Sequence, residues 1–532
     1  MGGIITLKLH DPQAIPRAAS PESAGISSEH LARIVGDILG EGLELHSIMV
    51  VRRGEVAYED FRAPYGPDDP HTMFSVSKSI TSIALGFAVD EGLVSLDDKV
   101  ADRVPELLKS PHENWDTLRV ADLIRMSGGK RPSILVDKRK KQWVRDYAKA
   151  AWAYAPGEGF NYCNENIYML CVIISRAAGM SVTDFLMPRL FEPLGIARPF
   201  WETDGRGVEA GGWGIFLKTE DLAKIGLCYL NEGKYRGRQV IPARWVAESG
   251  RDQSAPAKDV SEGWNHGYGY GFWMNRAPGG CRMDGMFAQF LFILPDYDAC
   301  IATTAGELHM GKIIDAIFRH LPALFDEQGA SCEVPKLPPY PPLPAAQRNP
   351  ALEARLNRSC IRFVPTAQPL GKAVGFPLSM LPAMILFMAA DKAGGVNRVH
   401  LRFEEENLKF SWSEGKERNT VLCGLDGRDR KCKITLGGME FIMACSAAWE
   451  GDTLQVRLRC LSSVAQRLLT FRFHGRMVRM LPRSLPGLEN MTASAADAVR
   501  DGLGSKALGS LVAGVMDRIT ALAEPEHVGY MG

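Results

Sequence analysis

Apolar positions in the N-terminal part of the chain follow two periods, one typical of strands and one typical of helices. The segment 46–61 carries two apolar stretches on either side of an Arg-Gly turn, which predicts a β-hairpin. Strands return over 268–305, and helical spacing marks 313–324. The intervening segment 71–245 is predicted to be mostly helical. This order predicts an α+β domain whose antiparallel sheet has helices on both sides.

A proline-rich segment, 335–344, separates this region from a C-terminal region with a different pattern, and it is typical of an extended linker. Beyond it, short stretches of alternating apolar and polar residues recur between turns, which predicts an antiparallel β-barrel or sandwich, lipocalin-like in form. The predicted strands are 398–403, 408–412, 420–425, 431–436, 439–444, 454–460, 467–473 and 477–481.

The patterns together predict four parts, with helical spacing over 493–523 marking the last of them. The parts are a first domain over 1–334, a linker over 335–350, a β-barrel over 351–490 and a helical tail over 491–532. The C-terminal parts have three predicted roles: to wall a site on the first domain, to form a homo-oligomer, or only to stabilise the chain.

The composition describes a chain with a large core and no bias of charge. The 532 residues exceed one ordinary domain, and 46% of them are hydrophobic. Basic and acidic residues both number 62, so the formal net charge is +0, which gives no reason to expect nucleic acid or an acidic membrane as a partner. The longest apolar run, 376–390, contains Pro377 and Pro382 and is too short to span a bilayer. Phosphate-binding loops and metal-type spacings are absent from the sequence, so we expect no cofactor and no metal.

The eleven cysteines are an odd number and are scattered without a pattern. That usage argues against a disulfide framework and favours a reducing compartment. Residues 1–11 have neither a basic start nor a long apolar stretch, so they do not look like a secretory signal. From these two observations we expect a cytoplasmic protein.

The most informative chemistry in the sequence is a Ser-x-x-Lys motif, Ser75 to Lys78. Residues three apart share one face of a helix, and an apolar stripe follows, so Ser75 is predicted at the N-terminus of a buried helix. A serine hydroxyl is a poor nucleophile unless a base removes its proton, and a partly desolvated lysine can be that base. The helix dipole would also favour developing negative charge there. The alternative is an ordinary surface helix start, because the motif is short.

Two further segments hold candidate chemistry. Tyr162 and Asn164 form a Tyr-x-Asn motif between a Pro-Gly turn and an apolar stretch, 167–174, that is predicted to be a buried helix. A tyrosine at such a junction can relay protons if a nearby ammonium lowers its pKa; the alternative is a buried tyrosine with a bonded hydroxyl. The segment 283–289 is predicted as a turn or strand edge before the apolar strand 290–296. Such an edge can offer a backbone N–H to an oxyanion, or it can be an ordinary hairpin.

These three segments, in this order and spacing, resemble the serine β-lactamase and penicillin-binding-protein-like hydrolases. The similar branch holds class C β-lactamases, carboxylesterases, D-aminopeptidases and 6-aminohexanoate-dimer hydrolases. Further stretches agree within residues 18–325: the connection 91–100, the helix and Ser-Gly turn 118–129, and the Gly-Gly turn and helix 211–226. Met126 stands where the family usually has threonine. The resemblance implies a β-lactamase-like antiparallel sheet flanked by helices.

The resemblance also implies a role for each matching residue. Ser75 would be the acylated nucleophile and Lys78 the residue that activates it. Tyr162 would pass a proton to the leaving group and later help to activate water, while Asn164 would contact the substrate or Lys78. The backbone N–H groups of Ser75 and Met286 would form the oxyanion hole.

The sequence departs from the antibiotic-processing members where they have Lys-Thr-Gly, because Met283, Asp284 and Gly285 stand there. The lysine that would pair with a substrate carboxylate is lost, which argues against β-lactam recognition. Asp284 could instead attract a substrate ammonium, or it could cap a turn. Aromatic residues near the motifs predict an apolar acyl or aryl pocket, with a role in the core as the alternative for some of them. These are Trp213, Trp264, Tyr268, Tyr270, Trp273 and Phe287.

The favoured function is therefore a serine hydrolase of small-molecule esters or amides that works through a Ser75 acyl-enzyme. The alternatives are a D-amino-acid or aminoacyl amidase or peptidase that uses Asp284, a β-lactamase or D,D-peptidase, and a catalytically silent module whose barrel binds a partner. The Ser-Lys-Tyr set argues against silence, but it does not separate an esterase from an amidase because both need the same chemistry.

Overall fold

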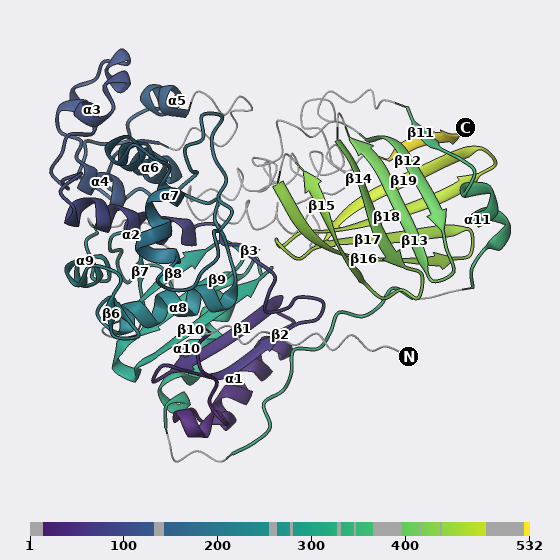
Figure 1. The fold of residues 1–532 in the computed structure, drawn as a ribbon, viewed down its shortest axis with the longest axis horizontal. Helices are drawn as coiled ribbons and strands as arrows, with labels where there is room; N and C mark the ends of the chain where they lie inside the picture. The colour runs from purple at the N-terminus through teal and green to yellow at the C-terminus, as the bar shows by residue number, and fades with distance from the viewer. Residues whose placement is uncertain are drawn as a thin grey trace, which may run out of the picture.

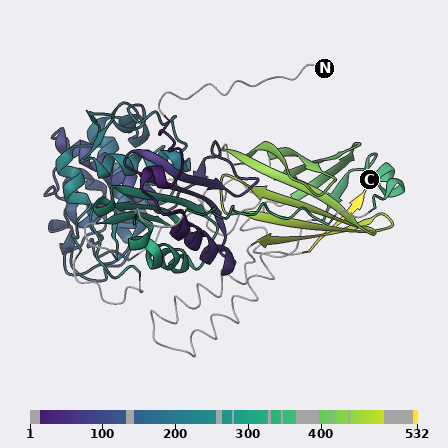
Figure 2. The ribbon, with the colours of Figure 1, turned by 90° about the horizontal axis from the view of Figure 1, so that it is seen from below.

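The computed structural model describes most of the chain as two bodies. An N-terminal domain and a C-terminal barrel lie side by side and are joined by the segment 331–344 (Figure 1). Figure 2 shows the same pair end to end along the long axis of the molecule. The predicted helix 493–523 and the apolar run 376–390 lie outside the described residues. Those residues are 14–131, 143–254, 263–276, 280–326, 331–344, 347–364, 396–414, 417–436, 439–485 and 526–532.

The N-terminal domain is built on a six-stranded sheet in which neighbouring strands are antiparallel, in the order β2-β1-β10-β9-β8-β7. The first two strands are the predicted hairpin. Its two turn residues, Arg53 and Gly54, both have positive φ, and this turn geometry matches the twist of the flanking strands. The strands are β1 (Leu45–Arg52), β2 (Glu55–Phe61), β7 (Trp273–Met274), β8 (Cys281–Gly285), β9 (Gln289–Leu294) and β10 (Ala299–Ala305).

Both faces of this sheet are buried, because side chains that alternate along each strand enter two different cores. In β1, Ile48 and Val50 belong to the core that holds α1 (Ser28–Gly40) and α10 (Met310–Leu324). The intervening residues, Met49 and Val51, belong to the larger core on the other face, which holds α8 (Thr219–Leu230) and the other helices of the helical insertion, residues 71–249. The predicted antiparallel sheet with helices on both sides is therefore confirmed.

The helical insertion carries the candidate chemistry. Its central helix α2 is buried along its whole length from Val76 to Ala88, and it packs against α6. The short strand β3 (His71–Thr72) ends shortly before α2 begins, and it pairs with β4 (Phe216–Leu217). The helices are α2 (Val76–Asp90), α3 (Val100–Arg103), α4 (Val120–Ile124), α5 (Trp143–Lys149), α6 (Asn164–Ala178), α7 (Val182–Leu186), α8 (Thr219–Leu230) and α9 (Ala243–Ser249), and a small hairpin joins β5 (Lys234–Tyr235) to β6 (Arg238–Gln239).

The C-terminal domain is a closed antiparallel barrel, as predicted. Among the described residues nine strands form a ring, which a single parallel contact between Gly424 of β14 and Ser446 of β16 closes, while β15 pairs with β16 outside it. A short helix, α11 (Pro350–Leu356), precedes the barrel. The strands are β11 (Ile361–Phe363), β12 (Val396–Phe403), β13 (Asn407–Glu414), β14 (Glu417–Gly424), β15 (Arg430–Leu436), β16 (Met439–Glu450), β17 (Thr453–Cys460), β18 (Gln466–His474), β19 (Met477–Leu485) and β20 (His527–Met531).

Strand β20 differs from the predicted tail, which was expected to be helical through residue 532. It lies between β11 and β19 and belongs to the barrel. Its inward residues His527, Gly529 and Met531 alternate with exposed or half-buried ones, a strand pattern too short to stand out in the sequence.

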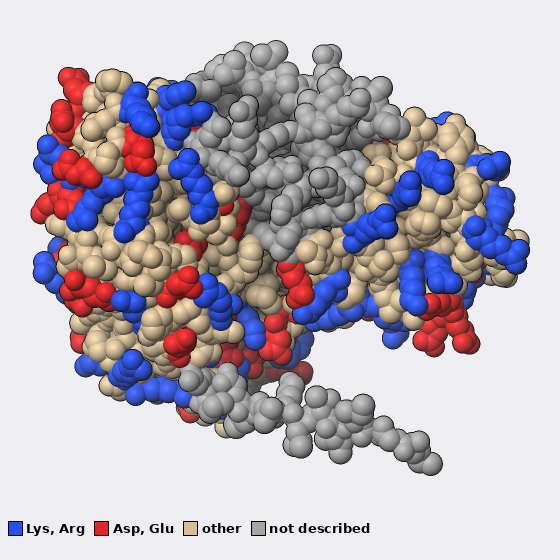
Figure 3. All heavy atoms as spheres, turned by 45° about the horizontal axis from the view of Figure 1, so that its top comes forward, with Lys and Arg blue, Asp and Glu red and all other residues tan. Residues whose placement is uncertain are grey.

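The expectations for surface charge, cysteines and membrane spans can be compared with the described residues. Lysine and arginine are interspersed with aspartate and glutamate over the face of the N-terminal domain in Figure 3, as the balanced composition suggests. All eleven cysteines are free thiols. Within the described ranges, no single helix has the length and apolar composition to cross a bilayer, although the bent pair formed by Asn164–Ala178 and Val182–Phe191 meets that test by length and composition.

Candidate active site

Ser75 lies at the N-cap of α2, directly after a strained residue. Phe74 has a φ of 45°, in the left-handed region that a bulky residue rarely adopts. The turn is held by the Val76 amide, which donates to the Met73 carbonyl, and by the Ser77 hydroxyl, which donates to the Phe74 carbonyl at 2.6 Å. The Ser75 hydroxyl is half-buried there, at the positive end of a long buried helix.

Lys78 is buried one turn further along α2, and its amine is held by three oxygens. Nζ lies 2.7 Å from Ser75 Oγ, 2.6 Å from Asn164 Oδ1 and 2.6 Å from the Gly212 carbonyl oxygen. Burial lowers the pKa of Lys78 to about 7. A neutral amine has two N–H donors and one lone pair. Because the two carbonyl oxygens can only accept, they take the donors, and the lone pair is left to face the Ser75 hydroxyl.

The Tyr-x-Asn motif lies beside this pair, at the start of α6. Asn164 is the first residue of α6 and contacts Lys78, which is one of its two predicted roles. The ring centroid of Tyr162 is 4.7 Å from Lys78 Nζ, and its ring stacks on Trp273 at 5.6 Å.

The acidity of Tyr162 differs from the sequence expectation. The predicted relay depended on a nearby ammonium that lowers the pKa of Tyr162. Burial instead raises that pKa above the usual value, and hydrogen bonding with Ser75 and Trp273 opposes this only in part. The reason is that burial also makes Lys78 a weak cation near neutral pH. Tyr162 is therefore a protonated phenol, able to give a proton rather than to take one from Ser75.

The predicted oxyanion hole lies where the turn after β8 approaches the start of α2. A Cβ at Gly285 would stand 2.2 Å from the Met73 carbonyl oxygen, so only glycine permits the approach. Met286 begins the turn, its side chain is 40% exposed, and the next residue, Phe287, has a φ of 64°. Within the described part of the chain, the backbone N–H groups of Ser75 and Met286 donate to no other protein group. They are therefore available to an oxyanion.

Strand β8 ends in a buried ion pair rather than a free charge. Asp284 Oδ2 accepts from Arg282 Nε at 3.0 Å and from Trp264 Nε1 at 2.7 Å. Arg282 is completely buried, and it also donates to the carbonyl oxygens of Met274 and Gly263. Burial raises the pKa of Asp284, and Arg282 opposes that shift. Asp284 does not cap a turn, and its charge is balanced inside the protein.

Two buried charged residues beside the site were not predicted from the sequence. Arg282 alternates with apolar neighbours in β8, and a cation in such a strand was the available signal. Glu165, fully buried in the first turn of α6, accepts from the Cys163 thiol at 3.3 Å, and its charge acts against the lowering of the Lys78 pKa. No group of three or more metal-type ligands is present among the described residues.

The predicted aromatic wall divides into a group near the site and a group in the core. Tyr268 and Trp273 pack around Tyr162. Trp213 is half-buried next to Gly212, and its indole N–H donates to Glu202 at 2.7 Å. Tyr270 instead packs on Trp245 of α9. Phe287 is buried against Phe74 and the barrel, and Trp264 is bonded to Asp284.

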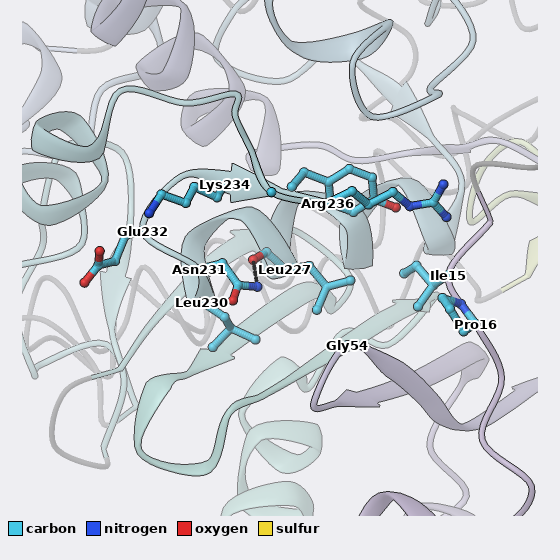
Figure 4. Close-up of a pocket in the computed structure, with 11 residues that line it drawn as sticks. Ile15, Pro16, Gly54, Leu227, Leu230, Asn231, Glu232, Lys234 and Arg236 are labelled. Carbon is cyan, nitrogen blue, oxygen red and sulfur yellow. Dashed lines mark hydrogen bonds between the residues drawn. The ribbon is translucent and has the colours of Figure 1, made fainter.

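The structure also has a separate hollow of about 650 Å³ (Figure 4). It is formed between the N-terminal segment at Ile15 and Pro16, the end of α8 and the β5–β6 hairpin. None of the predicted site residues lines it. Asn231, the C-cap of α8, bonds back to the Leu227 carbonyl at 2.8 Å within it.

The comparison with protein families decides the ancestry of this site. The profile of the Beta-lactamase family matches residues 36–317, more than half of the chain and all within the N-terminal domain. The chain belongs to the beta-lactamase family. This match includes the Ser-x-x-Lys, the Tyr-x-Asn and the β8 turn.

Curated proteins are similar over part of the chain. The 6-aminohexanoate-dimer hydrolase of Paenarthrobacter ureafaciens is 29% identical over 217 residues, which are 38% of this chain and 55% of that protein. A beta-lactamase of Yersinia enterocolitica is 27% identical over 175 residues, 32% of this chain and 44% of that protein. The chain spans about half the length of the curated relatives that it matches.

Solved structures give a more distant likeness. A penicillin-binding protein homologue from Caulobacter crescentus has a TM-score of 0.48 and 17% identity, covering 57% of this chain and 98% of that one. EstCE1, described as a hydrolase with promiscuous acyltransferase activity, has a TM-score of 0.46 and 16% identity, covering 55% of this chain and 99% of that one.

Proposed function

We propose that this protein is a serine hydrolase that cleaves small esters or amides through an acyl-enzyme on Ser75. The observation that carries the proposal is the buried amine of Lys78, 2.7 Å from Ser75 Oγ and with a pKa lowered to about 7. A base with that pKa is half deprotonated near neutral pH. A large fraction of it is then the neutral amine that can accept a proton, and the ammonium that forms still holds that proton. The names of the curated relatives, two kinds of hydrolase, support the same reaction class.

In the acylation step, Ser75 Oγ attacks the substrate carbonyl carbon while its proton passes to Lys78 Nζ. The carbonyl oxygen becomes negative and is held by the N–H groups of Ser75 and Met286. The bond to the leaving group then breaks, and the protonated phenol of Tyr162 supplies the proton that the leaving oxygen or nitrogen needs. Lys78, whose Nζ lies 4.7 Å from the centroid of the Tyr162 ring, then returns to the phenolate the proton that it took from Ser75.

In the deacylation step, water takes the place of the leaving group. Lys78, neutral again, accepts the proton of the attacking water while the phenol of Tyr162 stays protonated. The ester bond to Ser75 then breaks, Lys78 returns the proton to Ser75 Oγ, and the acid leaves. Asn164 keeps its place as the acceptor that orients the Lys78 amine throughout.

The charges at β8 support an uncharged substrate at that edge. Met283 is buried in the core, and the guanidinium of Arg282 is held by Asp284 and two carbonyl oxygens. Strand β8 thus offers no cation to a substrate carboxylate, which argues against β-lactams and D,D-peptides. It equally offers no uncompensated carboxylate to an ammonium, so a neutral ester or amide is favoured over an aminoacyl substrate.

The test compares wild type with Ser75→Ala on p-nitrophenyl acetate and butyrate. We expect turnover by wild type and none by the variant. Intact mass after treatment with a fluorophosphonate should show one adduct on wild type, formed as fluoride leaves, and none on Ser75→Ala.

The matched control is Ser175→Ala. Ser175 lies on α6, and its hydroxyl has no hydrogen-bond partner among the described residues, so its removal should leave turnover and labelling unchanged. Labelling without ester turnover would favour a narrow amidase. Neither labelling nor turnover by wild type would favour a non-catalytic binding module and sink the proposal.

A further inference from the structure

The loop between β17 and β18 of the barrel is buried, although loops usually lie on the surface. We call this loop, Leu461–Ala465, the docking loop. Each of its five residues is at most 2% exposed, because the loop is pressed against the N-terminal domain. The burial of its backbone is compensated locally: Leu461 N donates to the Ile442 carbonyl, and Ile442 N donates to Ser462 Oγ.

The docking loop contacts the segment that leads into Ser75. The amide of Thr72 donates to the Ser462 carbonyl at 2.9 Å, three residues before the nucleophile. The hydroxyl of Tyr65 donates to the Ser463 carbonyl at 3.4 Å. The loop therefore holds the N-terminal domain by its backbone as well as by side-chain packing.

Val464, at the tip of the docking loop, packs on the two residues that flank the oxyanion hole. It forms a small buried cluster with Phe74 and Phe287, whose ring centroids are 5.2 Å apart. Phe74 directly precedes the Ser75 amide, and Phe287 directly follows Met286. Both have positive φ, a conformation that persists in bulky residues only where the surroundings impose it.

We propose that the docking loop positions both donors of the oxyanion hole, and that Val464 is the positioning residue through which the barrel sets the rate of hydrolysis. The inference rests on the proposed function. Val464 packs in one cluster with the two phenylalanines. Phe74 belongs to the peptide that carries the Ser75 N–H, and Phe287 holds Met286 from its C-terminal side, so Val464 restrains the first donor directly and the second through Met286. A donor that is only slightly misplaced stabilises the transition state less, while the bound ground state is little affected. The barrel would then be part of the catalytic apparatus without touching the substrate.

The experiment compares Val464→Ala with Val478→Ala. Val478 is a fully buried valine in the barrel core on β19, so the two variants lose the same methyl groups from the same domain. For Val464→Ala we expect kcat for p-nitrophenyl butyrate to fall about tenfold with KM within about twofold, because misplaced groups in a transition-state site lower kcat selectively. Val478→Ala should keep both constants while its Tm falls. Val464→Ile, which retains the branched side chain, should restore kcat.

A second readout uses phenylboronic acid, which bonds to a reactive serine and places an oxygen in the oxyanion hole. Its Ki should rise for Val464→Ala in step with the loss of kcat, and should not change for Val478→Ala. Equal kinetics in the two alanine variants, with a fluorophosphonate adduct on wild type, would overturn the role of Val464 alone. If wild type forms no adduct, both this inference and the proposed function fail. If Val464→Ala does not fold, Val464→Cys, which loses one of the two branches of valine but stays apolar, takes its place with a smaller fall in kcat expected.

Discussion

In the barrel, the buried guanidinium groups of Arg457 and Arg459 lie 3.2 and 3.3 Å from the Asp429 carboxylate, whereas in the N-terminal domain the three hydrogen-bond partners of buried Lys78 are all neutral. A carboxylate partner keeps a buried cation charged and inert. Neutral partners offset little of the cost of burial, and the charges of Glu165 and Asp284 offset it only in part, so the pKa of Lys78 falls until the amine can act as a base. Burial of a cation thus leaves a paired, structural group in one domain and a reactive base in the other.

Replacing one buried cation in the N-terminal domain and one in the barrel gives the strongest test of this contrast. Lys78→Met should lower kcat/KM by about a thousandfold, because the general base is lost, and its Tm should not fall below that of wild type. Arg457→Met should keep kcat/KM and lower stability by about 2 kcal/mol, since a hydrogen-bonded charge pair is broken. Ester hydrolysis and thermal denaturation measure the two quantities. A Lys78→Met enzyme with near-normal turnover would show that both buried cations are structural.

The pH dependence of wild type gives the second test. Only the neutral amine of Lys78 can take the proton of Ser75, so activity requires deprotonation and must rise with pH through a pKa of about 7. Between pH 6 and pH 8 we expect kcat/KM to rise about tenfold. Phenol protonation at Tyr162 should impose no limit in this range, because its pKa is raised. A flat profile over this interval would contradict the assignment of Lys78 as the base.

The Arg282–Asp284 pair should behave as the barrel pairs do, although it lies beside the site. Asp284→Asn leaves Arg282 buried without its carboxylate, so we expect stability to fall by about 3 kcal/mol. Any change in KM should be small and the same for a neutral ester and an aminoacyl ester of similar size. Steady-state kinetics on the two esters decide the matter. A KM that rises only for the aminoacyl ester would instead assign Asp284 to recognition of an ammonium.

The sequence allowed the parts that depend on local spacing to be predicted. The β1–β2 hairpin, the helix that begins at Ser75 and the barrel strands follow from periodicity and turn chemistry, and the contact between Ser75 and Lys78 follows from their separation on one helix. What the sequence did not reveal depends on residues far apart in the chain. The pairing of Arg282 with Asp284 is short in range, but its burial is set by β7 and by the loop at Gly263. The pairing of strand β20 depends on the closed barrel, and the position of Val464 beside Phe74 depends on the contact between the barrel and the N-terminal domain.

Strand β20 has a consequence for the order in which the molecule matures. Ser75 and Lys78 are translated early. The ring of the barrel lacks its strand between β11 and β19 until residue 531 has been translated. Until then the docking loop has no complete barrel to carry it onto Phe74 and Phe287. A nascent chain, or a product truncated before β20, would hold the nucleophile and its base without a formed oxyanion hole. Hydrolytic competence would then appear only after β20 has been made, long after the nucleophile and its base.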